Sequence, residues 1–406
     1  MLDPQAIAAA HGAIAPYVYR SPCAYSLQLS RDTGLELYLK LENLQMTGSF
    51  KERGALHRLL QLSAAQRRCG VITASAGNHA QGLAYHAARL GVAATVCMPV
   101  RTPLVKVTAT QKHGAQVILH GQDYDDACAH AQHLARARGH VFVHPFDDPA
   151  VIAGQGTVAV ELLAQLPALD AVIAPIGGGG LLGGMALWLK HHRPQVRVIG
   201  VQSERLPSAV QAIGAGQPLT VPPSRTLADG IAVRRVGRQT LPLLQRYVDA
   251  VALVSEEAIA AAILRLLEGE KTVAEGAGAT ALAAVLSGKV ELPPGSRTVV
   301  LVCGGNIDVN LLGRIIDRGL VLDGRRLRLR LQLADDPGAL HAALATVATE
   351  GANILDVVHH RAFASVDLAS TAVDLTLELR DAAHGQSLVH ALRARGQEVT
   401  PLSAFA

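Results

Sequence analysis

Long apolar runs, basic clusters and paired cysteines are scarce in this chain. No stretch approaches the run of about 20 apolar residues that a membrane-spanning helix requires, because Gly, His or Arg interrupts the apolar segments. The 37 Lys and Arg residues nearly balance the 33 Asp and Glu residues, and the densest basic cluster consists only of Arg325, Arg326, Arg328 and Arg330. Nucleic-acid binders carry a wider basic surface than this. We therefore expect neither a membrane nor a nucleic-acid partner.

The five cysteines lie far apart in the sequence and form no CxxC pair. The N-terminal segment MLDPQAIAAAHGAIAPY has neither the basic start nor the apolar core of a secretory signal. Both features predict reduced thiols and a cytoplasmic location. With 406 residues, of which 50% are hydrophobic, the chain is long enough for two or three domains with cores of their own.

Strand-like and helix-like segments alternate between about Leu35 and Leu320. Short β-branched runs such as GVITAS and RTVVLVC predict strands, and the Ala- and Leu-rich segments between them have helical periodicity. Helices are indicated at 78–90, 123–138, 151–165, 256–267 and 277–286. This alternation predicts an α/β domain whose parallel sheets are covered by helices. Ligands of such domains collect at the carboxyl ends of the strands.

The pattern changes after Val321. A basic hinge, LDGRRLRLR, leads into a segment with the order β-α-β-β-α-β, which is the arrangement of a ferredoxin-like unit of about half the usual domain size. We predict a first domain over 1–320, with a small subdomain at about 48–148, and a second domain over 326–406.

Lys51, in the segment TGSFKERG, is the candidate for covalent chemistry. It begins a predicted helix, and Gly48 and Gly54 allow a close approach to the backbone. A Schiff-base lysine must lose its proton at modest cost and must sit on a rigid element. The helix dipole disfavours a lysine at a helix start, so an ordinary surface lysine is less expected here. Taken alone, Lys51 fits a structural role equally well.

Four glycines, 177–180 in PIGGGGLLGG, follow a predicted strand and precede a predicted helix. Their backbone N–H groups and the positive end of the helix suit a phosphate. The segment lacks the GxxxxGK[ST] pattern, so a triphosphate is not expected. The alternative is a flexible turn, although four glycines in a row cost considerable backbone entropy.

Two polar segments, SAGNHAQG and VCGGN, also follow predicted strands. Asn78 in the first could simply cap its helix, and His79 could simply pack. Together with Lys51 and the glycine run, however, Asn78 and Cys303 complete a set of groups. This set is the one needed to bind pyridoxal phosphate as a Schiff base. These requirements are a lysine, an amide, a phosphate-sized loop and a weakly polar partner.

These segments, in this order and with LKLEN upstream, resemble the serine/threonine dehydratase family of fold type II pyridoxal-phosphate enzymes. The resemblance runs from about Pro16 to Gly319. It implies a tryptophan-synthase-β-like catalytic domain of two parallel-sheet subdomains. The implied reaction converts L-threonine, and also L-serine, to a 2-oxo acid and ammonia. DDPGAL and GANILDVVHHRAF resemble an ACT regulatory domain, so an ACT-type ferredoxin-like fold is implied for the C-terminal segment.

The resemblance also assigns roles to matching positions. Lys51 would carry the Schiff base and then remove the α-proton of the substrate, Asn78 would bond the ring hydroxyl, and Cys303 would face the ring nitrogen. The other implied cofactor contacts are Phe50, Gly177, Gly178, Gly179, Gly180, Leu181 and Glu275. The implied carboxylate loop consists of Ser75, Gly77 and His79.

Some positions depart from the pattern of neighbouring relatives. Serine is commoner at the position of Cys303, and a thiol is a weaker hydrogen-bond partner than a hydroxyl. Ala76 replaces the second serine of racemases, so we expect negligible racemisation. Gln202 and Ser208 stand where metal-activated relatives have Glu and Asp, so we expect no metal there.

Asp336 and Gly338 lie at the first strand-to-helix turn of the ACT-like segment. The backbone there could receive the carboxylate of an amino-acid effector, and the resemblance implies isoleucine or valine. The alternative is a dimerisation module in which His359 and His360 only pair or face solvent. By resemblance we expect a homodimer or homotetramer. A serine or 3-hydroxyaspartate ammonia-lyase, and an amino-acid sensor without activity, remain open alternatives.

Overall fold

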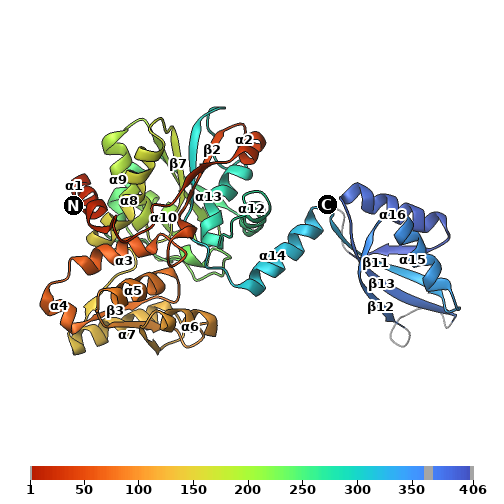
Figure 1. Cartoon of the computed structure of the whole chain (residues 1–406), viewed down its shortest axis with the longest axis horizontal. Helices are drawn as coiled ribbons and strands as arrows, with labels where there is room; N and C mark the ends of the chain where they lie inside the picture. The colour runs from red at the N-terminus through yellow and green to blue at the C-terminus, as the bar shows by residue number, and fades with distance from the viewer. Residues whose placement is uncertain (1, 361–368, 403–406) are drawn as a thin grey trace. The chain divides into compact units, whose positions relative to one another are not determined.

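The chain divides into two compact units, Met1–Ile307 and Asp308–Ala406, which are described separately. The computed structural model describes residues 2–360 and 369–402 (Figure 1). None of the helices in these ranges combines the length and the apolar character needed to cross a membrane.

A six-stranded sheet forms the larger part of the first unit. Its strand order is β1-β2-β10-β7-β8-β9, and every pair is parallel except β1 with β2. The strands are β1 (Cys23–Tyr25), β2 (Glu36–Leu41), β7 (Ala171–Pro175), β8 (Arg197–Ser203), β9 (Ala250–Val254) and β10 (Arg297–Val302). The helices of this part are α1 (Pro4–Ile14), α2 (Leu27–Thr33), α8 (Pro149–Gln165), α9 (Gly180–His192), α10 (Ser208–Ala215), α11 (Thr240–Tyr247), α12 (Glu256–Glu268) and α13 (Gly276–Leu286). Buried β-branched residues in the central strands match the predicted two-sided burial.

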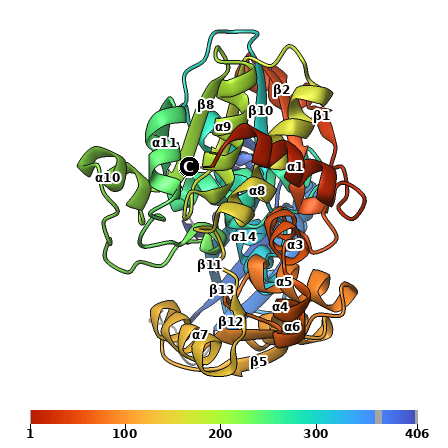
Figure 2. The same cartoon turned by 90° about the vertical axis from the view of Figure 1, so that its left-hand side faces the viewer.

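A second, four-stranded parallel sheet with the order β5-β4-β3-β6 belongs to the small subdomain, which Figure 2 shows below the larger sheet. Its strands are β3 (Val71–Ala74), β4 (Ala94–Met98), β5 (Gln116–Leu119) and β6 (Val141–Phe142). Its helices are α3 (Lys51–Leu60), α4 (Ala64–Cys69), α5 (Asn78–Arg89), α6 (Leu104–Lys112) and α7 (Tyr124–Arg138). The α/β fold with parallel sheets is therefore confirmed.

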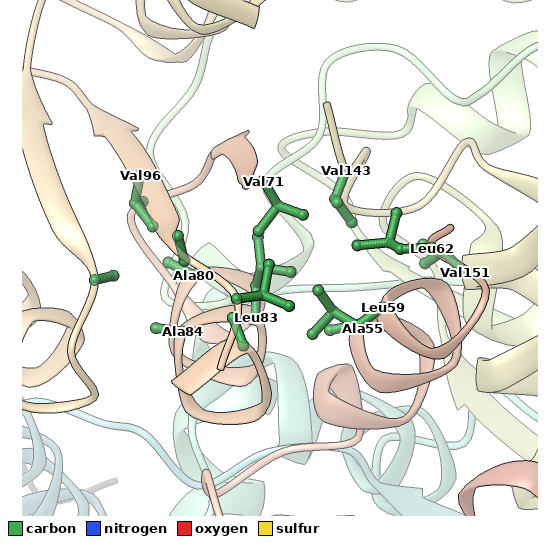
Figure 3. Packing of buried hydrophobic residues seen from close by; sticks show 14 of the residues in the cluster. Ala55, Leu59, Leu62, Val71, Ala80, Leu83, Ala84, Val96, Val143 and Val151 are labelled. Atoms are coloured by element: carbon green, nitrogen blue, oxygen red, sulfur yellow. The ribbon is translucent and has the colours of Figure 1, made fainter. Parts of the chain in front are cut away.

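Apolar side chains fix α3 and α5 against the small sheet. Leu59 of α3 and Leu83 of α5 meet Val71 and Val96 of the sheet in one buried cluster, and Val151 of α8 joins it (Figure 3). Because α8 also packs on α1 and α9, this cluster connects the small sheet to the helices of the larger part of the unit.

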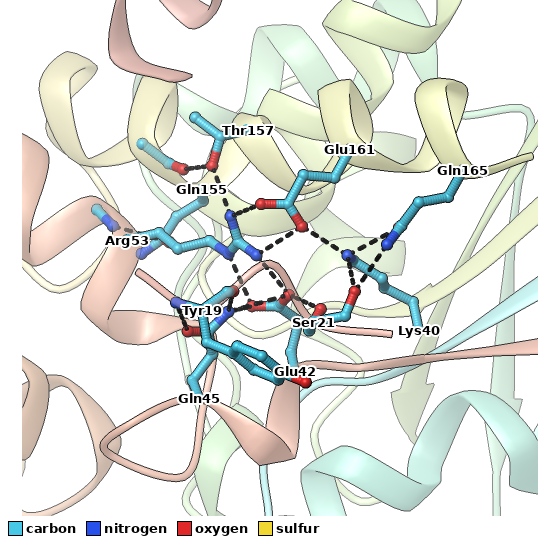
Figure 4. Close-up of polar contacts among 12 residues, drawn as sticks. Tyr19, Ser21, Lys40, Glu42, Gln45, Arg53, Gln155, Thr157, Glu161 and Gln165 are labelled. Carbon is cyan, nitrogen blue, oxygen red and sulfur yellow. Dashed lines mark hydrogen bonds and ion pairs between the residues drawn. The ribbon is translucent and has the colours of Figure 1, made fainter. Parts of the chain in front are cut away.

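A group of buried charges holds α3 from its other side. Arg53 binds Glu42 and Glu161, each at 2.7 Å, and Lys40 Nζ lies 2.6 Å from Glu161 Oε2 (Figure 4). All four side chains are at most 3% exposed. The two cations and two anions balance, which is the condition under which ionised groups can be buried. Arg53, two residues after Lys51, thereby ties α3 to the turn that follows β2 and to α8.

The second unit begins with α14 (Val309–Leu322), which precedes an antiparallel sheet with the order β12-β13-β11-β14. Its elements follow the predicted order as β11 (Arg326–Ala334), α15 (Ala339–Thr349), β12 (Asn353–His360), β13 (Ser370–Glu378), α16 (Ala382–Ala394) and β14 (Glu398–Pro401). The fold agrees with an ACT-like domain. The last three letters of GANILDVVHHRAF, 361–363, lie outside the described residues.

The structure corrects the prediction of a basic hinge before this sheet. Arg326 already belongs to β11, and the leucines that alternate with the arginines, from Leu327 onward, are buried in the core of the second unit. Strand alternation therefore places Arg328 and Arg330 on the other face, where both contact Asp374.

Candidate active site

The segments singled out in the sequence meet within the first unit at the carboxyl ends of the strands. Phe50 N donates to Cys303 O at 3.1 Å, and Ser49 forms a β-bridge with Gly304. These contacts place the start of α3 beside the end of β10. One cavity is lined by Phe50, Lys51, the glycines 177–180 and Leu181. The predicted lysine and the predicted phosphate loop thus share a cavity, although about 125 residues separate them in the chain.

Lys51 Nζ donates a hydrogen bond to Pro145 O at 3.1 Å and lies 5.2 Å from the centre of the Phe50 ring. Burial lowers the pKa of Lys51 to about 8, against the opposing influence of Cys303 and Glu275. About a tenth of the amine is then unprotonated at pH 7. A neutral amine is the form that attacks an aldehyde.

The glycine loop connects β7 to α9. Gly179 has φ +92°, which other residues rarely adopt, and a Cβ on Gly178 would lie 2.2 Å from the ring of Phe146. Thr240 Oγ1 donates to Gly178 O at 2.6 Å and holds the turn. The backbone N–H groups of 177–181 donate to no other described residue. This arrangement of free donors at a helix start fits a phosphate.

Asn78 is the first residue of α5, but its side chain does not cap the helix. Asn78 Nδ2 instead donates to Glu275 Oε1 at 2.6 Å. Burial, with a contribution from the charge of Asp229, raises the pKa of Glu275 to about 7. A Cβ on Gly230, which lines the cavity, would lie 3.1 Å from Glu275 Oε1, so the pair lies beside the cavity.

Cys303 is 1% exposed at the end of β10. Burial and the nearby Glu275 raise the pKa of its thiol well above the usual range. The thiol therefore remains neutral at physiological pH. A neutral group with weak hydrogen-bonding capacity matches the weakly polar partner that the sequence predicts.

The loop between β3 and α5 contains Ser75, Gly77 and His79. Gly77 N donates to Ser75 Oγ at 3.2 Å, which shapes the turn. Burial, together with the charge of Lys51, lowers the pKa of His79 to about 3, so this ring is neutral. His79 Nε2 lies 3.3 Å from Val143 O, and Nδ1 has no partner in the described part of the chain. Because a carbonyl only accepts, Nε2 carries the ring hydrogen.

Two residues of the site were not predicted. Asn306 contacts Asn78, and its only signal in the sequence was its place at the end of CGGN. Phe146 lines the cavity and packs on the glycine loop. It follows a short strand, and sequence alone does not show that this aromatic side chain turns toward 177–180.

Gln202 and Ser208 bond to each other and to their surroundings. Gln202 Nε2 donates to Ile176 O at 3.2 Å and to Ser208 Oγ at 3.4 Å, while its Oε1 accepts from Ala209 N at 2.9 Å. Ser208 Oγ donates to Val233 O at 2.7 Å. The amide of Gln202 thus joins β8 to the start of α10. Over the described residues, no group of three or more His, Cys, Asp or Glu side chains could hold a metal ion.

The family model "Pyridoxal-phosphate dependent enzyme" matches residues 14–304. The chain belongs to this family. Its cofactor is pyridoxal phosphate, as predicted, and the resemblance found in the sequence is confirmed. The chain is 47% identical to an L-threonine ammonia-lyase of Thermotoga maritima over 94% of this chain and 95% of that protein. It is 45% identical to an L-threonine ammonia-lyase of Geobacter sulfurreducens over 95% of this chain and 96% of that protein. The solved structure of the processed form of threonine deaminase isoform 2 from Solanum lycopersicum superimposes with a TM-score of 0.73 at 35% identity, covering 77% of this chain and 92% of that chain.

Proposed function

We propose that this chain converts L-threonine to 2-oxobutanoate and ammonia, and L-serine to pyruvate and ammonia. The proposal is carried by the meeting of Lys51, the glycine loop and the Asn78–Glu275 pair at one cavity. Similarity to L-threonine ammonia-lyases over nearly the whole chain supports threonine as the substrate.

Lys51 is the base in this proposal. When bound, pyridoxal phosphate withdraws electrons and weakens the bond to the α-hydrogen of an amino acid. Lys51 Nζ would hold the aldehyde of the cofactor and, once the substrate amine has replaced it there, would accept the α-proton of the substrate as a free amine. A pKa of about 8 supports this role, since a general base works best when its pKa is near the operating pH.

The neutral partner at the end of β10 suits an elimination. We assign Cys303 to the ring nitrogen, Asn78 to the ring hydroxyl and the N–H groups of 177–181 to the phosphate. Phe50 would pack beside the ring. A neutral thiol cannot supply the negative charge that keeps a ring nitrogen protonated. Weaker withdrawal of electrons favours prompt loss of the β-hydroxyl.

The substrate carboxylate is assigned to the loop with Ser75, Gly77 and His79. Asn78 and His79 are the first two residues of α5. Their backbone N–H groups donate to no other described residue, so they are available to an anion. Since the His79 ring is neutral, the residue would bind the carboxylate through its backbone N–H group rather than through a charged side chain.

Release of the 2-oxo acid from L-threonine, L-serine and 3-hydroxyaspartate tests the proposal. We expect kcat/KM to be highest for threonine. A preference of about tenfold or more for another substrate would overturn the assignment. Turnover that survives Lys51→Ala would refute the chemistry, and binding without turnover of any of the three would identify a sensor.

The second unit is proposed to bind an amino-acid effector of the isoleucine or valine class. Gly338 has φ +95° and is the N-cap residue directly before α15, two residues after Asp336. We expect Gly338→Asp to abolish the rate response to isoleucine or valine, because its carboxylate repels that of the effector. Gly351→Asp is a matched control, since Gly351 also has a positive φ of +77° and open space around its Cβ position. Equal responses in both variants would refute this site.

We further propose a homodimer or homotetramer in the cytoplasm. All five cysteines are free thiols, which supports a reducing compartment. Light scattering of the purified chain, read as molar mass, measures the number of subunits, and a monomeric mass would contradict the proposal.

A further inference from the structure

Asn306 has no part in the reaction as proposed so far, yet its side chain is held on two sides. Asn306 Nδ2 donates to Thr47 O and to Asn78 Oδ1, both at 2.8 Å. These two bonds use both hydrogens of the amide nitrogen. Because the Thr47 carbonyl can only accept, it decides which end of the Asn306 amide faces Asn78.

The orientation of Asn306 in turn decides that of Asn78. With its oxygen held by Asn306, Asn78 directs its nitrogen to Glu275 Oε1 at 2.6 Å. An amide nitrogen carries two hydrogens, and Glu275 takes one. The second hydrogen is the one that would reach the ring oxygen of the cofactor.

Neighbouring glycines leave room for these bonds. Gly48 has φ +72°, and a Cβ there would lie 2.5 Å from Asn306 Oδ1. A Cβ on Gly304 would lie 2.4 Å from Glu275 Oε1. Gly305 N donates to Gly48 O at 2.9 Å and fixes the two segments side by side. The glycines of CGGN therefore serve the same chain of hydrogen bonds as its asparagine.

We propose that Asn306 is a positioning residue that holds the amide nitrogen of Asn78 toward the ring oxygen of pyridoxal phosphate. This inference rests on the role assigned to Asn78 in the proposed function.

Glu275 alone cannot maintain this orientation at every pH. As a carboxylate it accepts only, but once protonated it can donate to an amide oxygen and allows Asn78 to turn over. With a pKa of about 7, Glu275 takes both forms near neutral pH. Asn306 has no such titration. The other groups that act on the pKa of Glu275 are Asp229, which raises it, and Asn78, Lys106 and Lys51, which lower it.

The test is the affinity of the apoenzyme for pyridoxal phosphate at pH 6 and pH 8.5, followed by absorbance. The result is the ratio of the Kd of the variant to the Kd of the unmodified chain. For Asn306→Ala we expect a ratio of about ten at pH 6, where Glu275 is protonated. At pH 8.5 the ionised Glu275 holds Asn78, and the ratio should fall to about twofold. If Asn306→Ala folds poorly, Asn306→Ser keeps one donor hydrogen and should show the same trend with a smaller amplitude.

Asn43→Ala is the matched control. Asn43 Nδ2 also donates two bonds, to Thr272 Oγ1 at 2.8 Å and to Val273 O at 2.9 Å, but none to Asn78. A merely structural role for Asn306 predicts that both variants lose stability and that neither gains a pH-dependent Kd ratio. That result would overturn the inference. Asn78→Ala separates the two levels: if it binds the cofactor normally, the role of Asn78 itself is wrong. If it binds weakly while Asn306→Ala binds normally at both pH values, only the positioning role is wrong.

Discussion

Loss of one charge from the buried ion group beside α3 should destabilise the first unit strongly. In Arg53→Met, Glu42 loses hydrogen bonds of 2.7 and 2.8 Å, and Glu161 loses bonds of 2.7 and 3.0 Å. Two carboxylates are then left with Lys40 as their single cation in a region at most 3% exposed. Breaking a buried ion pair by removing one partner costs about 3–5 kcal/mol, and we expect a loss of that size.

A second substitution shows whether the charges act together. Arg53→Met with Glu42→Gln leaves the Lys40–Glu161 pair, which is neutral overall, so the double variant should be about 1–2 kcal/mol more stable than Arg53→Met. Arg297→Met is the surface control. Its ion pair with Asp170 is 42% and 45% exposed, and its loss should cost less than about 1 kcal/mol.

Urea unfolding followed by circular dichroism measures these differences through the midpoint and slope of the transition. If Arg53→Met costs no more than Arg297→Met, the buried charges do not hold α3 as described. If the effects of Arg53→Met and Glu42→Gln simply add, the two residues are not coupled.

Four further results are expected. The unprotonated fraction of Lys51 rises from about a tenth at pH 7 to about nine-tenths at pH 9, so the apoenzyme should capture pyridoxal phosphate roughly tenfold faster, measured by stopped-flow absorbance; a flat rate contradicts the lowered pKa. Cys303→Ser offers a stronger hydrogen bond and should shift the visible absorption band of the bound cofactor, whereas an unchanged spectrum and turnover would mean that this contact matters little. Ala76→Ser should produce D-serine from L-serine, detectable by chiral chromatography, and no D-serine would count against the reason given for negligible racemisation. EDTA should leave activity unchanged, because the Gln202 amide forms its own bonds in that region; reversible loss of activity would show that a cation is required.

Strand-to-helix junctions were the part of the fold that the sequence predicted well. The helix predicted at 78–90 is observed at Asn78–Arg89, and the one predicted at 151–165 is observed at Pro149–Gln165. Local periodicity determines such segments. The same reasoning predicted that the glycine loop, SAGN and CGGN lie at one edge of the sheets, since ligands collect at the carboxyl ends of parallel strands.

Contacts between distant polar residues could not be predicted in this way. Arg53 and Glu161 are of residue types that usually lie on the solvent-exposed surface of a helix, yet both are buried and form an ion pair. Asn306 lies 228 positions along the chain from Asn78, and no local sequence pattern predicts a contact between residues so far apart. Each depends on which elements pack together, and that is settled by the whole unit rather than by any single segment.

The strand order of the larger sheet has a consequence for how the protein is made. β10 lies between β2 and β7, although it is the last of these strands to leave the ribosome. At about 5–20 residues per second, roughly 250 residues take about 12–50 s to synthesise, and during that time β2 lacks its parallel neighbour. Cys303 and its backbone bond to Phe50 come directly after β10, so the candidate site can be complete only once β10 has been made.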